Sequence, residues 1–284
     1  MNKRKLLTLA MTLCMVAILA IGGTLAYFTD ADKDVNVMTA GNVKIVQNET
    51  DREGNAWSEN NEKDMFPAVY FDEDGKPYNP TYTWEGPKSE NNGGSTVVTG
   101  PDGNEMTMYA KGIENEIDKV ISVTNKGNLP AYIRTIVLIE NQAKGTTPNI
   151  MEKLHINRNT ASANITEEWL PIRAEIDGVT YSVGVYTYAD ALESGATSKA
   201  SLKQIWLDPS ADNTWYELLG DGKLNIIAFS QAVQVTGFEE IGGAATALDT
   251  AFGQVTSDNI ADWLADENLT IKTSGLNNVV GGGN

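Results

Sequence analysis

Asp-Gly turns between β-rich runs are the feature that most constrains the fold of this chain. Asp-Gly turns separate segments rich in Val, Ile, Thr and Tyr at four places: Asp74-Gly75, Asp102-Gly103, Asp177-Gly178 and, within a Gly-Asp-Gly sequence, Gly220-Asp221-Gly222. Asp-Gly pairs supply the positive φ angles that tight hairpin turns require. The sequence therefore predicts a mainly β protein with antiparallel sheets.

The expected core strands lie at residues 120–124, 131–139 and 224–235. Residues 136–139 are apolar at consecutive positions, which predicts a strand that is buried on both faces at the centre of a sheet. The last segment is long enough to cross a whole β-sandwich.

Helical periodicity is confined to the late part of the chain. Ile241, Ala245, Leu248 and Phe252 line one helical face, and Gly253 stands where a helix C-terminus is expected. A second short helix is expected to begin at Ser257 or Asp258. We therefore expect one or two short helices near the C-terminus.

The N-terminus has the layout of a secretory signal peptide. Residues 1–5 are basic, residues 6–21 are almost wholly apolar, and residues 22–26 are mostly small. The apolar run is shorter than the roughly 20 residues that a membrane span needs. Cleavage is expected after Ala26, with Thr24 at the third position back and Tyr27 as the new N-terminus. An uncleaved N-terminal anchor is the alternative.

The chain divides into segments by composition. We expect a signal peptide at 1–26, a mature N-terminal segment with the first strand at 27–48, a polar hairpin insertion at 49–112, a β-sandwich core with late helices at 113–274, and a flexible tail at 275–284. The insertion carries Trp57 and Trp84, which indicate either local clasps in long surface hairpins or a ligand site.

Composition argues against several classes of function. A net charge of −17, from 21 Lys and Arg against 38 Asp and Glu, disfavours nucleic-acid binding. The single His155 and single Cys14 cannot form a Cys/His zinc cluster. His155 lacks metalloprotease spacing, so we interpret it as structural, and no nucleophile elbow, phosphate loop or dinucleotide motif is present. We expect no cofactor and no enzymatic activity.

Three alternate carboxylates, Asp30, Asp32 and Asp34, have the spacing that opens a calcium loop. Val35 and Gly41 then stand where an EF-hand requires Gly and Glu, so that motif fails. These residues remain weak calcium candidates that would need ligands from elsewhere, and a solvated acidic run is the simpler reading.

Cleavage after Ala26 would free a segment that can add to a sheet edge. Its apolar residues are Tyr27, Phe28, Val35, Val37 and Met38. An added strand satisfies the open backbone groups of an edge and buries alternate side chains. Two alternatives stand beside this donor strand: the segment is the first strand of its own sheet, or it is disordered.

The chain resembles a known family of exported proteins. Residues 22–30 and 39–45 are similar to the leader and first strand of the TasA and camelysin family of Gram-positive bacteria, and most of all to the clostridial alternate signal-mediated exported proteins. Residues 123–134, 230–234 and 247–253 fit the same branch. The resemblance implies a jelly-roll-like sandwich and processing by a SipW-type signal peptidase. For TasA it implies biofilm fibres in which one subunit's N-terminus completes the next subunit's sheet. Camelysin has been described as a metalloprotease, but no recognisable zinc site occurs here.

We therefore expect a secreted, non-enzymatic structural protein of the cell surface or biofilm matrix. Its expected partners are the signal peptidase and either further copies of itself, joined head to tail, or related matrix subunits. The rival function is a monomeric cell-surface module that binds a polysaccharide or a protein through the loops between Trp57 and Trp84. A camelysin-like metalloprotease ranks below both.

Overall fold

The computed structural model describes most of the region between residues 37 and 265. The described ranges are 37–40, 43–56, 70–71, 77–78, 95–109, 117–141, 149–158, 164–176, 178–207, 224–238 and 242–265. The predicted signal peptide and tail lie outside them, as do Trp57 and Trp84.

Two β-sheets stack face to face. The five-stranded sheet has the order β1 (Val37–Ala40), β13 (Ile226–Gln234), β8 (Ala131–Glu140), β11 (Val179–Tyr188) and β10 (Ile165–Ile176). The four-stranded sheet has the order β2 (Ile45–Thr50), β7 (Ile117–Asn125), β12 (Leu202–Leu207) and β9 (Leu154–Arg158). All pairings are antiparallel except that of β1 with β13, which is parallel. The predicted mainly β sandwich is confirmed.

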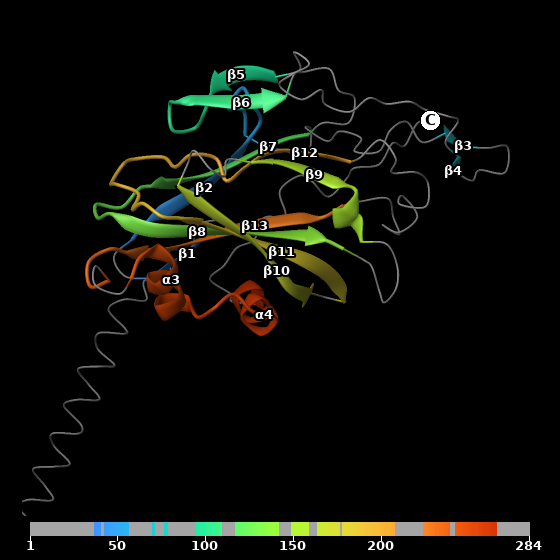
Figure 1. Ribbon diagram of the computed structural model, residues 1–284. Coiled ribbons are helices and arrows are strands. Elements are labelled where there is room, and N and C mark those ends of the chain that lie inside the picture. The colour runs from blue at the N-terminus through green and yellow to red at the C-terminus, as the bar shows by residue number, and fades with distance from the viewer. Residues whose placement is uncertain are drawn as a thin grey trace, which may run out of the picture.

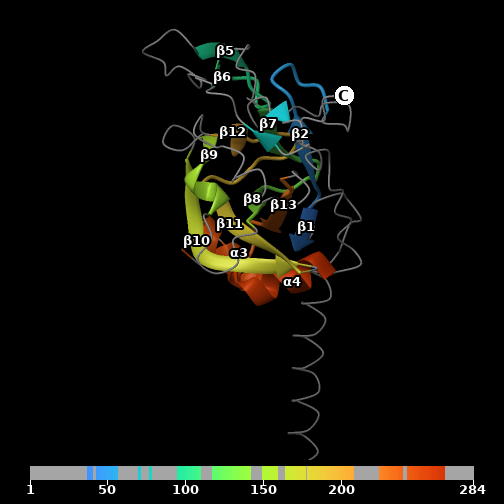
Figure 2. The same cartoon turned by 90° about the vertical axis from the view of Figure 1, so that its right-hand side faces the viewer.

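Further elements cover the outer faces of the two sheets. The hairpin of β5 (Ser95–Thr99) and β6 (Glu105–Tyr109) lies over the four-stranded sheet, and the helices α3 (Ala244–Phe252) and α4 (Ser257–Ala265) lie under the five-stranded sheet (Figures 1 and 2). A small hairpin of β3 (Tyr70–Phe71) and β4 (Pro77–Tyr78) and the short 3-10 helix η3 (Ile150–Glu152) complete the described elements. The short C-terminal helices are as predicted.

The predicted hairpins are found wherever the structure describes them. Ile176 pairs with Val179 across Gly178, whose φ is 80°. Gly103, with a φ of 79°, donates to the carbonyl of Gly100 in the turn between β5 and β6. Both glycines adopt the left-handed conformation that the turn demands. The turn predicted at residues 220–222 lies outside the described residues.

β8 is the central strand of the five-stranded sheet, as its apolar run predicts. Val137 and Ile139 point into the core between the sheets, whereas Ile136 and Leu138 join a second cluster with Trp263 of α4. Because both faces of the strand are buried, polar and apolar residues do not alternate in this part of its sequence.

Arg134 fixes the helices to the sheet from a buried position on β8. Its guanidinium donates to Gln231 Oε1 at 2.6 Å, to Asp249 Oδ1 at 2.6 Å and to the carbonyl of Gly253 at 2.9 Å. It also lies 5.6 Å from the ring centre of Trp263. Burial lowers the pKa of Arg134, and the ion pair with Asp249 opposes that shift. One side chain thus holds the end of α3, the strand β13 and α4 together.

The Asn125-Lys126-Gly127 turn also has a structural role. Asn125 is fully buried, and its amide donates to the carbonyls of Leu129 at 2.8 Å and Leu192 at 2.9 Å while accepting from Gly127 N at 2.9 Å. A Cβ on Gly127 would stand 3.0 Å from the backbone nitrogen of Lys44. Glycine is needed because two backbones approach each other closely.

Replacing Arg134 by Met should destabilise the protein by about 2–4 kcal/mol, because the three hydrogen bonds that its buried guanidinium donates are lost while the apolar stem is kept. Urea unfolding measures the change. Lys126→Met, at an exposed position, is the control and should change stability by less than about 0.5 kcal/mol. Equal stability of the two variants would contradict the role of Arg134.

Replacing Asn125 by Ala should cost about 2–3 kcal/mol, since the three hydrogen bonds of its fully buried amide are lost and the carbonyl of Leu129 is left without that donor. Asn128, in the same turn, is exposed and provides a matched control. Thermal unfolding should show a clear loss for Asn125→Ala and almost none for Asn128→Ala. A similar small change in both would show that the amide of Asn125 does not hold the turn.

Candidate functional site

Most of the sequence-predicted site residues lie outside the described part of the chain. These are the cleavage residues Thr24, Ala26 and Tyr27, the calcium candidates Asp30, Asp32 and Asp34, and the donor-strand residues Phe28 and Val35. The other two donor-strand candidates, Val37 and Met38, form the start of β1 and pair with Ser230 and Gln231 of their own chain.

His155 stacks on Trp206 across β9 and β12. The ring centres are 5.4 Å apart and the rings are nearly parallel, at 9°. His155 is exposed whereas Trp206 is only 8% exposed, so the imidazole covers the indole. Within the described ranges, no group of three or more His, Cys, Asp and Glu residues could hold a metal ion.

The edge of β13 is covered by β1 along only part of its length. β1 pairs with residues 230–233, and no strand in the described part of the chain pairs with residues 226–229 on that side. Glu140 N donates to the carbonyl of Asn225 on the β8 side. Hydrogen-bonding direction alternates along an antiparallel strand, so the N–H and C=O groups of Ile226 and Ala228 face the β1 side.

The side chain of Gln47 in β2 forms a hydrogen bond with one of these backbone groups. Its Nε2 donates to the carbonyl of Ala228 at 2.9 Å and to Glu49 Oε1 at 2.9 Å, and its Oε1 accepts from the Ser230 hydroxyl at 2.7 Å. Glu49 in turn forms a buried ion pair with Lys119 of β7. A side-chain bridge therefore links the two sheets where a backbone partner would otherwise be required.

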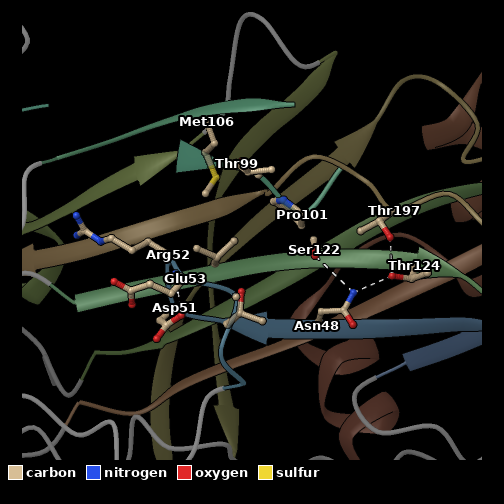
Figure 3. Close-up of a pocket in the computed structure, with 14 residues that line it drawn as sticks. Asn48, Asp51, Arg52, Glu53, Thr99, Pro101, Met106, Ser122, Thr124 and Thr197 are labelled. Atoms are coloured by element: carbon tan, nitrogen blue, oxygen red, sulfur yellow. Dashed lines mark hydrogen bonds between the residues drawn. The ribbon is translucent and has the colours of Figure 1, made fainter. Parts of the chain in front are cut away.

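A polar groove lies on the outer face of the four-stranded sheet. It lies between strands β2 and β7 on one side and the tip of the β5–β6 hairpin on the other, and has a volume of about 620 Å³ (Figure 3). Met106 and Met108 of β6 anchor the hairpin against Val120 and Ala200. Lys203 of β12 adds a hydrogen bond of 2.9 Å to the carbonyl of Thr107.

The floor of the groove carries a row of neutral polar side chains. Asn48 Nδ2 donates to the hydroxyls of Thr124 at 2.9 Å and Ser122 at 3.5 Å, and Thr124 shares a hydrogen bond of 2.9 Å with Thr197. Figure 3 shows these contacts running across the strands, from Asn48 of β2 through Thr124 of β7 to Thr197. Successive side chains of β2 and of β7 point to opposite faces of the sheet. Asn48, Ser122 and Thr124 therefore all project from the face that points away from the core.

One wall of the groove is the turn that begins at Asp51. Its Oδ1 accepts from the backbone N–H groups of Glu53 and Asn55, both at 2.9 Å, and its Oδ2 accepts from Asn55 Nδ2 at 2.8 Å. Burial raises the pKa of Asp51, but these hydrogen bonds outweigh it and leave the pKa below its ordinary value. Asp51 is therefore ionised at neutral pH and holds the turn in shape.

Arg52 forms an ion pair with Asp118, so its guanidinium is not directed into the groove. Its Nε lies 2.5 Å and its Nη2 lies 2.6 Å from the two carboxylate oxygens of Asp118, which also accepts from Gln204 at 3.1 Å. The positive charge is thereby neutralised in a bidentate contact. Among the described residues that line the groove there is no His, Cys or Lys, so the arrangement suits binding by neutral hydrogen bonds.

Sequence reasoning missed this groove because it searched the 57–84 region for aromatic binding residues. The available signal was the alternation of Ser122 and Thr124 with the core residues Ile121 and Val123 in β7. Polar residues at every second position of a wholly buried strand indicate a second layer over that face.

The described helices include none that is long and apolar enough to span a bilayer. No protein-family model, no curated protein and no solved structure matches the chain.

Proposed function

We propose that this chain is an exported, non-enzymatic structural protein of the cell surface or biofilm matrix. After cleavage by a SipW-type signal peptidase, the freed N-terminal segment adds as a strand to a neighbouring copy, and the copies form a fibre. Two features of the sequence support the proposal: the secretory layout of residues 1–26 and the resemblance to the TasA and camelysin family.

The observation that carries the proposal is the partly covered edge of β13. β1 and β13 run parallel in a constant register, with Val37 opposite Ser230. The same register, continued toward the N-terminus, would set residues 33–36 opposite residues 226–229. Val35 would then face Ala228, whose backbone groups point to that edge. The residues just before β1 thus match the length of edge that β1 leaves uncovered.

Supply of that strand by a neighbour would generate a fibre. The donor and acceptor surfaces differ, so each added copy presents the same pair of surfaces again. Within one chain, the same residues compete for their own edge. Freedom of the N-terminus after cleavage is what lets a neighbour enter.

Residues 33–36 alone would bind weakly. Each backbone hydrogen bond contributes about 1 kcal/mol net, and one buried large apolar side chain adds about 1.5–3 kcal/mol. Association costs at least about 4 kcal/mol in lost translational and rotational freedom. Tyr27 and Phe28, at the start of the mature chain, supply the further apolar surface that is needed to make the free energy of association favourable.

A monomeric cell-surface binding module is the second candidate function. The polar groove over β2 and β7 favours it, because a lined cavity of about 620 Å³ falls within the range of small-molecule sites. Size-exclusion chromatography distinguishes the two functions, since a persistent monomer across salt and calcium concentrations would support the module.

Deletion of residues 27–36 from the mature protein should abolish filaments in electron micrographs and leave the circular dichroism spectrum unchanged, because β1 is retained. Deletion of the tail, residues 275–284, is the matched control and should leave filaments intact.

A point substitution sharpens this test. Val35→Lys should suppress filaments, whereas Val97→Lys, on the β5–β6 hairpin at a side chain that is 58% exposed, should not. Filaments of normal length from the protein without residues 27–36, or no filaments from the unaltered protein, would contradict assembly through this segment.

A further inference from the structure

We propose that the groove between strands β2 and β7 and the β5–β6 hairpin binds a neutral chain of N-acetylated amino sugars. The proposal is independent of fibre assembly, because the groove and the β13 edge belong to different sheets. It stands on three properties of the groove: spare hydrogen-bonding capacity, an adjoining apolar patch, and the absence of an available positive charge among the described lining residues.

The floor has polar atoms that the fold does not use. The Nδ2 of Asn48 donates to the hydroxyls of Ser122 and Thr124, whereas its Oδ1 has no partner among the described residues. The hydroxyl of Thr50, the next residue on the same face of β2, likewise has no side-chain partner in the described ranges. An acetamido N–H would donate to Asn48 Oδ1, and a sugar hydroxyl would exchange hydrogen bonds with Thr50.

An apolar patch lies beside these polar atoms. Met106 is 4% exposed and Val120 is 2% exposed, and both line the groove together with Pro101. Apolar lining with a few placed polar groups is typical of small-molecule sites. Met106 and Val120 are already almost wholly covered, so the partly exposed Pro101 provides most of the apolar surface that the methyl group of an acetamido substituent would contact and that an unsubstituted glucose ring would leave in water.

Charge selects a neutral saccharide over an acidic one. The chain carries a net charge of −17, and the turn of Asp51 and Glu53 forms one wall. Arg52 is committed to Asp118 by two hydrogen bonds. A uronic acid or phosphate would therefore meet repulsion without a compensating cation.

The affinity for a short oligosaccharide should be low. No aromatic side chain stands among the described lining residues to stack on a sugar ring. A dissociation constant of about 1 mM is expected for one tetramer. A long polysaccharide engaging many copies of the protein in a matrix would bind far more tightly through multivalency.

The test titrates the purified exported protein with three tetrasaccharides and follows backbone amide shifts by NMR. The probes are chitotetraose, which carries N-acetyl groups, cellotetraose, which has the same linkage without them, and tetragalacturonic acid, which is anionic. Chitotetraose should bind saturably and shift the amide signals of Asn48, Thr50 and Ser122. Cellotetraose should bind at least fivefold more weakly, and the acidic tetramer should not bind.

Thr50→Val removes one hydroxyl at constant shape and should weaken chitotetraose binding about fivefold or more, by the loss of one hydrogen bond. Thr187→Val, half-buried on β11 of the other sheet, is the control and should bind as the unaltered protein does. The spectra themselves report whether each variant is folded.

Three outcomes would each overturn the proposal: no saturable binding of chitotetraose, equal affinity for cellotetraose, or unchanged binding by Thr50→Val. Fibre formation is scored separately by electron microscopy of the same samples. Loss of filaments with retained sugar binding would refute assembly alone, and the reverse would refute the groove alone.

Discussion

Unpaired backbone groups at sheet edges are the constraint on which the rest of this structure depends. Three edges of the sandwich satisfy or protect these groups in different ways. β10 is interrupted by a register shift between Trp169 and Arg173, in the stretch that contains Pro171, and β9 is short. β13 is protected by the four residues of β1 and by the side chain of Gln47. The register of β1 on β13, continued toward the N-terminus, would bring the segment that we propose as the donor strand to this edge.

Polar contacts between side chains connect elements of this fold that are distant in sequence. Because the chain has a single cysteine, Cys14, it can form no internal disulfide, and its fold depends on its core and on hydrogen bonds. Arg134 secures the helices, Gln47 joins the two sheets and Asn125 fixes the turn against Leu192. Arg158 of β9 and Glu167 of β10 form an ion pair between the sheets on the side opposite Gln47. The Arg134–Asp249 contact, the Gln47 bridge and the Arg158–Glu167 pair connect elements that the backbone ladders do not.

The sequence predicts the parts of the fold whose causes are local. The turns at Gly103 and Gly178, the two-faced burial of residues 136–139 and the helix that ends before Gly253 all follow from short patterns. The parallel pairing of β1 and the Gln47 bridge do not, because they join residues far apart along the chain, whose proximity no local pattern encodes. The groove requires a hairpin to dock over another sheet, which the alternation of Ser122 and Thr124 indicates only in part.

Amide hydrogen exchange at the edge of β13 tests strand addition most directly. The N–H group of Ala232 faces the retained part of β1 and should exchange slowly in every state. Those of Ile226 and Ala228 should exchange quickly in protein without residues 27–36 and become strongly protected in filaments of the mature chain. Fast exchange at Ile226 and Ala228 inside filaments, or full protection in the shortened protein, would contradict assembly through this edge.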